Sequence, residues 1–291
     1  MKTLIILMLN PNKLTILRIF LLPLPCALLF LETYYAKLAA IGLGSLLGFT
    51  DYLDGVLARR HKKITPLGTF LDPVADKIFI TTVYLTLTYL GYLSFLPISL
   101  IILREIFISY LRSWFFEETK VINLSKLKTF FLMIFAGIVI LLNLYFSKYF
   151  YLVDYLLWIL VFISYLTGIP YFYRVFKKIL KFRDQMNLFF EKLPSLIYPL
   201  SLVFIFPFTN SFFWIPILCI NFYFFKKGLA RVSPKWVQEE SIFVYLLIIL
   251  LSLELIFYKK IYFSLFILFI YSFLNDGIET IKLSWKILNL K

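Results

Sequence analysis

The chain has 291 residues, of which 62% are hydrophobic and 20% aromatic, and its mean hydropathy is +0.89. A soluble domain usually has an apolar share of only ~45–50%, so the composition excludes an ordinary soluble fold and predicts a membrane protein. The formal net charge is +14, but in membrane proteins an excess of Lys and Arg marks the cytoplasmic loops, and nucleic-acid binding is not expected.

The N-terminal segment begins with one lysine and an apolar run, a pattern shared with secretory signals. Asn10, Pro11, Lys13 and Arg18 interrupt this run, and no small-x-small cleavage motif follows it. We therefore expect a short segment in the cytoplasmic interface that leads into a first membrane span.

Six consecutive segments are long and apolar enough to cross a bilayer, and they cover residues 14–31, 38–59, 68–90, 95–116, 128–146 and 149–173. Most of the Lys and Arg residues between them lie in the connections 60–67, 117–127 and 174–192. The opposite connections hold little besides Lys37 and Lys148. Because cytoplasmic loops carry the positive charge, this pattern predicts a cytoplasmic N-terminus and a multi-pass protein of the cell membrane.

Beyond residue 193 the apolar pattern is broken by Pro194, Pro199, Pro207 and Pro216. Two short or kinked helices are expected between 193 and 225, followed by spans at 241–257 and 261–280. The predicted fold is an all-α polytopic membrane protein with a six-transmembrane-helix catalytic domain at 1–180. Residues 193–291 form an additional C-terminal transmembrane helical region, either a lipid-entry or dimer-supporting bundle or a fused module of unrelated function.

Four aspartates interrupt the predicted second and third spans. A charge at the centre of a membrane helix costs about 2.5–3.5 kcal/mol on insertion scales, so such residues need a compensating partner. Asp51, Asp54, Gly55, Ala58 and Arg59 are spaced along one stripe of the second helix, and Gly68, Asp72 and Asp76 along one stripe of the third.

The two stripes are joined by a short connection, and Pro66 suits the first turn of the following helix. An antiparallel pair of helices would then bring the four carboxylates together at its cytoplasmic end. Carboxylates that lie so close repel one another unless a cation compensates, and their oxygens suit hard divalent ions such as Mg²⁺. The alternative is a buried salt-bridge cluster with Arg59, Arg104 or Lys77.

The pattern Asp51-x-x-Asp54-Gly55-x-x-Ala58-Arg59, eight residues, then Gly68-x-x-x-Asp72-x-x-x-Asp76 resembles the signature of the CDP-alcohol phosphotransferase family. Within that family the closer resemblance is to bacterial phosphatidylglycerophosphate synthases, and it covers roughly residues 10–180. The segments that carry it are Pro11-Asn12-x-x-Thr15-x-x-Arg18, the run from Phe70 to Lys77, Arg104-Glu105-Ile106 with Arg112 and Trp114, and the run from Ser125 to Thr129. The C-terminal hundred residues have no counterpart in the usual synthase.

The resemblance implies that CDP-diacylglycerol is the donor and that Mg²⁺ or Mn²⁺, as a pair of ions, is required. Asp51, Asp54 and Asp72 match the positions that hold the two ions on the CDP diphosphate, while Asp76 matches the general base and also touches metal. The positions that line the CDP pocket are matched by Asp51, Gly55, Ala58, Arg59, Gly68 and Asp72, with Asn12 and Thr15 in an N-terminal motif near the nucleotide. The family also implies a homodimer among membrane lipids, with catalysis at the cytoplasmic face.

The acceptor implied by the closer resemblance is sn-glycerol 3-phosphate, which carries a phosphate group. Arginine forks and lysine point charges bind phosphate, so Arg104, Arg112, Lys126 and Lys128 are the candidates for this role. For Arg104 the alternative is an ion pair with the adjacent Glu105 or an interfacial position.

Two alternative functions stay open, one within the same family and one of a different class. Another member of the family could use inositol phosphate, serine or phosphatidylglycerol as its acceptor, because the signature reads only the donor. An ion-coupled transporter also keeps acidic residues inside its helices, although it predicts them near the midplane of the membrane. Cys26, Cys219, His61 and the thin polar cluster of Asn275, Asp276 and Glu279 are given no mechanistic role.

Overall fold

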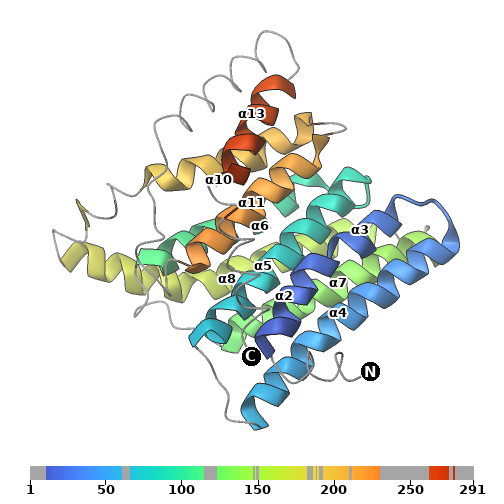
Figure 1. Ribbon diagram of the computed structural model, residues 1–291, viewed down its shortest axis with the longest axis horizontal. Coiled ribbons are helices and arrows are strands. Elements are labelled where there is room, and N and C mark those ends of the chain that lie inside the picture. Colours follow the sequence, from blue (N-terminus) through green and yellow to red (C-terminus); the bar gives the residue numbers. More distant parts are fainter. Residues whose placement is uncertain are drawn as a thin grey trace. The chain divides into compact units, whose positions relative to one another are not determined.

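The computed structural model describes residues 11–60, 66–114, 123–146, 148, 151–181, 186–187, 189, 193–209, 212–229, 262–274 and 278. Within these ranges the side chains at 11–14, 50–60, 66–70, 114, 123–127, 194–195, 229 and 262–265 are not described. The regular elements of the described residues are all helical (Figure 1), as the long apolar segments predict. Two compact units are interleaved along the chain: the first takes in residues 1–94, 129–157 and 281–291, and the second residues 95–128 and 158–280.

The first unit begins with α2 (Pro11–Leu21) and α3 (Pro23–Leu29), which stand where a single span was expected at 14–31. Proline has no backbone N–H and starts helices well, so Pro23 begins a new helix directly after Leu22. Both helices pack along α4 (Tyr34–Arg60), and α2 also packs against α5 (Pro66–Tyr89) (Figure 1). As expected, α5 begins at Pro66.

The greater part of α7 (Asn123–Tyr145), from residue 129 onward, completes the first unit together with the first turns of α8 (Leu152–Lys181). The fully buried Tyr84 of α5 donates its hydroxyl hydrogen to the carbonyl oxygen of Leu132 on α7, at 2.9 Å. At the other end of α7, Lys37 Nζ donates to Asn143 Oδ1 at 3.2 Å. These polar bonds fix how α7 is placed against α4 and α5.

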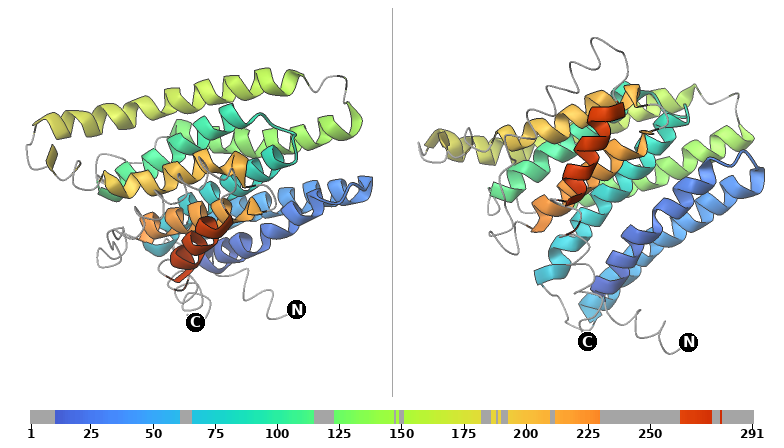
Figure 2. Two further views of the ribbon diagram at one scale, coloured as in Figure 1. Left: turned by 90° about the horizontal axis from the view of Figure 1, so that it is seen from above. Right: turned by 45° about the horizontal axis from the view of Figure 1, so that its top comes forward.

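The second unit is built around α6 (Phe95–Trp114). Two C-terminal helices, α10 (Pro194–Ile205) and α11 (Trp214–Leu229), pack on α6, and α13 (Tyr262–Ser272) packs on α11 (Figure 2). A short 3₁₀ turn, η2 (Phe206–Phe208), links α10 toward α11 and stacks Phe206 on Phe95 at 6.3 Å between ring centroids. The two short helices expected between 193 and 225 are therefore present.

Two described helical stretches, Lys128–Tyr145 and Leu152–Lys181, are long and apolar enough to cross a membrane. Large apolar side chains remain exposed along α8, among them Trp158, Phe162, Tyr173 and Phe176. A helix that faces lipid keeps such residues on its outer surface. The predicted span 241–257 lies outside the described residues, and the number of spans stays a prediction.

Candidate active site

Helix α5 carries two of the four signature aspartates, Asp72 and Asp76, one helical turn apart. Residues four apart lie on the same face of a helix, and both carboxylates are partly exposed while the neighbouring Leu71 and Ala75 are buried. Pro73 stands between them, inside the helix. These two acids therefore present oxygen atoms on one side of α5.

Helix α2 contacts both of these aspartates. Thr15 Oγ1 donates a hydrogen bond to Asp72 Oδ1 at 3.2 Å, and Arg18 Nη2 lies 3.8 Å from Asp76 Oδ1. Thr15 is 1% and Arg18 3% exposed. Residues three apart on α2 therefore contact residues four apart on α5. Thr15, which is predicted to lie near the nucleotide, bonds to one of the signature aspartates.

Arg18 belongs to the N-terminal motif, but the sequence did not predict that it lies at the site. The signal that could have identified it is its position in an apolar segment, since a buried arginine requires an anionic or polar partner. Its positive charge offsets part of the repulsion between the carboxylates of Asp72 and Asp76, which lie one helical turn apart.

The other residues that are predicted to bind the CDP-linked donor lie at helix ends, and their side chains are not described. In the backbone, α4 ends at Arg60 and α5 begins at Pro66, so the two halves of the signature flank one short connection. Among the described side chains, no group of three or more His, Cys, Asp and Glu residues gathers as a metal site. The four-carboxylate metal site stays a prediction, as do the roles of Asn12, Asp51, Asp54, Gly55, Ala58, Arg59 and Gly68.

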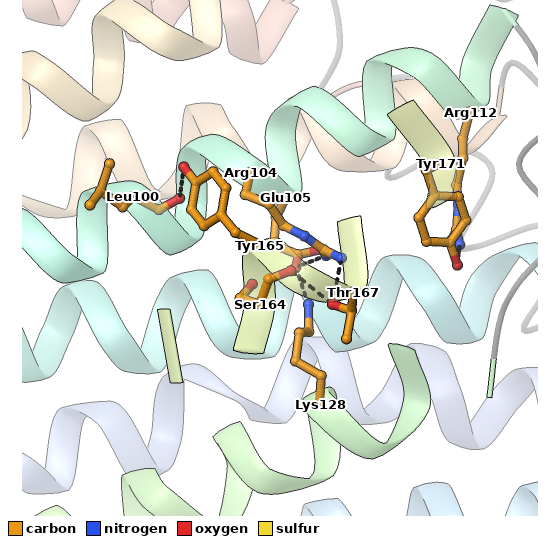
Figure 3. Close-up of polar contacts among 9 residues, drawn as sticks. All are labelled: Leu100, Arg104, Glu105, Arg112, Lys128, Ser164, Tyr165, Thr167 and Tyr171. Atoms are coloured by element: carbon orange, nitrogen blue, oxygen red, sulfur yellow. Dashed lines mark hydrogen bonds and ion pairs between the residues drawn. The ribbon is translucent and has the colours of Figure 1, made fainter. Parts of the chain in front are cut away.

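In the second unit, Arg104 and Lys128 meet on one carboxylate, that of Glu105 (Figure 3). Arg104 Nη1 lies 2.6 Å from Glu105 Oε1, and Lys128 Nζ pairs with the same oxygen. Arg104 Nη2 also donates to Thr167 Oγ1 of α8 at 3.1 Å. The pair with Glu105, which the sequence raised as an alternative to phosphate binding, is thus formed, and it holds two of the four predicted phosphate ligands together.

Arg112 lies further along α6 and contacts a different residue of α8. Its Nη2 donates to the hydroxyl of Tyr171 at 2.9 Å, and its guanidinium carbon lies 5.0 Å from the centre of the Tyr171 ring (Figure 3). Both side chains are buried. The fourth predicted phosphate ligand, Lys126, lies in the first turns of α7, where side chains are not described.

Thr167 and Tyr171 were missed from the sequence. Both are common in apolar helices, and their spacing from the arginines is set by how α8 packs rather than by any local motif. Only the fold brings these residues, which are 63 and 59 positions from their arginines, into contact with them.

Positive charge exceeds negative charge among these buried groups. Arg104, Arg112 and Lys128, called the buried cations below, are 3%, 5% and 2% exposed, and Glu105, their neighbouring carboxylate, is 4% exposed. Arg112 acts electrostatically on Lys128, as does Arg104. Because unbalanced charge is costly at low dielectric, an anionic ligand such as a phosphate dianion would relieve the excess.

The sequence of this chain is similar to those of known phosphatidyltransferases. Residues 8–169 match the model of the CDP-alcohol phosphatidyltransferase family. The CDP-diacylglycerol–glycerol-3-phosphate 3-phosphatidyltransferase of Rickettsia typhi is 34% identical over 168 residues, which are 56% of this chain and 94% of the relative. The proteins of the same name from Pseudomonas fluorescens and Escherichia coli K12 are 41% identical over 109 residues and 38% identical over 112 residues. These two matches cover 37% and 38% of this chain, and 56% and 62% of the relatives. The family match ends inside α8, so α10, α11 and α13 lie beyond it.

Proposed function

The chain belongs to the CDP-alcohol phosphatidyltransferase family, and from this premise we propose that it transfers a phosphatidyl group from CDP-diacylglycerol to sn-glycerol 3-phosphate, releasing CMP. The observation that carries the choice of a phosphorylated acceptor is the buried cluster of Arg104, Lys128 and Glu105, in which two cations share one carboxylate. An acceptor with a phosphate group supplies the negative charge that this cluster lacks, whereas serine brings no net charge. The names of the relatives from three bacteria support the same acceptor.

On the donor side, Asp51, Asp54, Asp72 and Asp76 are proposed to hold two divalent ions, Mg²⁺ or Mn²⁺. The fit rests on the donor set, because carboxylate oxygens suit these ions and the partly exposed carboxylates of Asp72 and Asp76 lie on one face of α5. When bound, the ions supply charge stabilisation to the diphosphate and the leaving group. Thr15 keeps Asp72 oriented through its hydrogen bond.

The proposed chemical step is a displacement at the phosphorus atom that carries diacylglycerol. The acceptor hydroxyl oxygen forms a bond to this phosphorus, and the bond from phosphorus to the oxygen of CMP breaks. Asp76 takes the proton of the attacking hydroxyl as general base, and CMP leaves with the electron pair of the broken bond. Asn12, Gly55, Ala58, Arg59 and Gly68 are proposed to line the CDP pocket.

On the acceptor side, Arg104, Arg112, Lys126 and Lys128 are proposed to bind the phosphate of glycerol 3-phosphate. Guanidinium groups bind phosphate oxygens with two parallel hydrogen bonds, and lysines add point charges. Fixing the phosphate also orients the acceptor hydroxyl at the other end of glycerol 3-phosphate, which lowers the entropic cost of bringing it to the reacting phosphorus.

The wider architecture belongs to the same proposal. A six-helix membrane domain at 1–180 carries catalysis at the cytoplasmic face, a C-terminal helical region at 193–291 is added to it, and the protein forms a homodimer in the cell membrane. The basic connections in the sequence and the two apolar helices at Lys128–Tyr145 and Leu152–Lys181 support a membrane location.

The test is the release of CMP by the purified full chain from CDP-diacylglycerol, with labelled acceptors supplied one at a time. We expect glycerol 3-phosphate to be consumed, and inositol phosphate, serine and phosphatidylglycerol to be left unused. If another acceptor is consumed while glycerol 3-phosphate is not, the acceptor assignment is wrong. Asp76→Asn should abolish turnover at saturating substrate and metal, and wild-type turnover in this variant would refute the general base.

A further inference from the structure

Helices α6 and α8 run parallel to each other through the second unit. Earlier residues of α6 contact earlier residues of α8, since Leu100 pairs with Tyr165 and Arg104 with Thr167. Later residues of α6 contact α8 about one turn further on, where Phe107 pairs with Phe172 and Arg112 with Tyr171. Two of the buried cations of α6 are therefore held by two residues of α8 that are one turn apart (Figure 3).

Thr167 is oriented to accept a hydrogen bond from Arg104. Its hydroxyl hydrogen is donated to the carbonyl oxygen of Ser164, 2.8 Å away, one turn earlier in α8. The lone pairs of Thr167 Oγ1 are thereby turned toward Arg104 Nη2. The other terminal nitrogen of Arg104 is fixed by Glu105, so the guanidinium plane is held from both ends.

Tyr171 holds Arg112 in a comparable way. Its side chain is 0% exposed, its hydroxyl accepts from Arg112 Nη2, and its ring lies 5.0 Å from the guanidinium carbon. Residue 171 lies just past the end of the family match at residue 169. The matched segment of the family therefore does not include this tyrosine.

Glu105 keeps two like charges close together. Arg104 and Lys128 would repel each other in a buried environment, and the carboxylate that both of them share offsets this repulsion. Because each cation pairs with one and the same oxygen, the spacing between them is set by Glu105.

We infer that Thr167, Tyr171 and Glu105 are positioning residues that hold the buried cations in the geometry that receives the phosphate of the acceptor. This inference rests on the proposed function, in which these cations bind glycerol 3-phosphate. The three residues touch the cations rather than the reacting atoms, so their loss should weaken use of the acceptor and leave use of the lipid donor intact.

The experiment measures kcat and both KM values for Thr167→Val and Tyr171→Phe, which remove a hydroxyl at nearly constant volume. We expect KM for glycerol 3-phosphate to rise about tenfold in each variant, since each loses a hydrogen bond to a charged group. KM for CDP-diacylglycerol should stay within about twofold, and competitive inhibition by inorganic phosphate should weaken in the same ratio as the acceptor KM. Thr167→Ser keeps the hydroxyl and should restore wild-type values.

Tyr165→Phe is the matched control. Tyr165 also joins α8 to α6, but its hydroxyl group donates a 3.1 Å hydrogen bond to the carbonyl oxygen of Leu100 rather than accepting one from a guanidinium group. We expect this variant to leave both KM values unchanged. An equal rise in the acceptor KM for Tyr165→Phe would mean that α6–α8 packing alone matters, and would overturn the inference.

Glu105→Gln tests the third positioning residue. It should raise the acceptor KM at least as much as the hydroxyl variants, and Glu105→Asp should recover part of the loss. Unchanged acceptor KM values in Thr167→Val, Tyr171→Phe and Glu105→Gln would also overturn the inference, while the proposed function would stand.

Failure of the proposed function has a different signature, because the wild type would then consume another acceptor in place of glycerol 3-phosphate. In that case the same variants are measured with the acceptor that is used. A phosphorylated acceptor whose KM rises upholds the positioning roles, and an acceptor without a phosphate group overturns them.

Discussion

Gly168 of α8 lies directly against the guanidinium of Arg104, and substitutions there should separate helix stability from acceptor binding. A Cβ atom added at Gly168 would lie 3.6 Å from Arg104 Nε, 3.5 Å from a ring carbon of Phe172 and 3.8 Å from Ile108 Cδ1. These are ordinary contact distances, so Gly168→Ala fits without moving a neighbour. Because glycine inside a helix costs about 0.5–1 kcal/mol relative to alanine, we expect Gly168→Ala to be slightly more stable than the wild type.

A larger side chain at the same position should act differently. Leucine adds three carbon atoms beyond Cβ to a space already bounded by Arg104, Phe172 and Ile108, and overpacking of this kind costs about 1–3 kcal/mol. Of these three neighbours, Arg104 is the one whose guanidinium group is hydrogen-bonded, to Glu105 and Thr167. Displacing its side chain would break those bonds. We expect Gly168→Leu to raise KM for glycerol 3-phosphate about tenfold.

Thermal unfolding in detergent and acceptor-dependent CMP release measure the two effects. Gly137, inside α7, is the control, because a Cβ added there would meet nothing within 4 Å. Gly137→Ala and Gly137→Leu should leave both KM values unchanged. If Gly168→Ala raised the acceptor KM as much as Gly168→Leu does, the reasoning from available space around Arg104 would be refuted.

Two further predictions rest on single hydrogen bonds, and a third rests on the packing around α6. Thr15→Val, which removes the hydrogen bond to Asp72, should lower kcat/KM about fivefold, and Thr15→Ser should not; equal activity in both variants would show that this bond does not matter. Tyr84→Phe should lower stability in detergent by about 1 kcal/mol, because it removes the hydrogen bond from the buried hydroxyl to the carbonyl of Leu132; an unchanged melting temperature would contradict this. Deleting residues 193–291 should lower the melting temperature and abolish CMP release, because it uncovers α6; a truncated chain with full activity would show that α6 needs no such cover.

The sequence predicted a helix well wherever a long apolar segment is enough to identify it. Most expected spans of the first 180 residues correspond to one helix each, and the start of α5 at Pro66 was anticipated. The first span was wrong in detail, because Pro23 begins a second helix there. Hydropathy averages over a window and does not register where a single proline restarts a helix.

The candidate site could be predicted only as far as its members carry charge. Asp72 and Asp76 are conspicuous in an apolar helix, and so is Arg104. Thr167 and Tyr171 carry no such signal, because hydroxyl groups are common in membrane helices and acquire a role only from what they touch. Which charge they touch depends on the register between α6 and α8, and no local pattern in either helix specifies that register.

The C-terminal helices change the surroundings of α6, the helix that carries two of the buried cations. Along α6, from Ile98 to Arg112, nearly all side chains are buried, because α8, α10 and α11 all contact this helix. The matched segment of the family ends at residue 169, before α10 and α11 begin. In a chain that lacks these helices, the same face of α6 must meet lipid or another chain. Here the cover is part of the same polypeptide, so α10 and α11 keep lipid from the part of α6 on which they pack. If these cations bind the acceptor as proposed, a low dielectric strengthens their attraction to the incoming phosphate, and we expect the added helices to favour acceptor binding without contacting the acceptor.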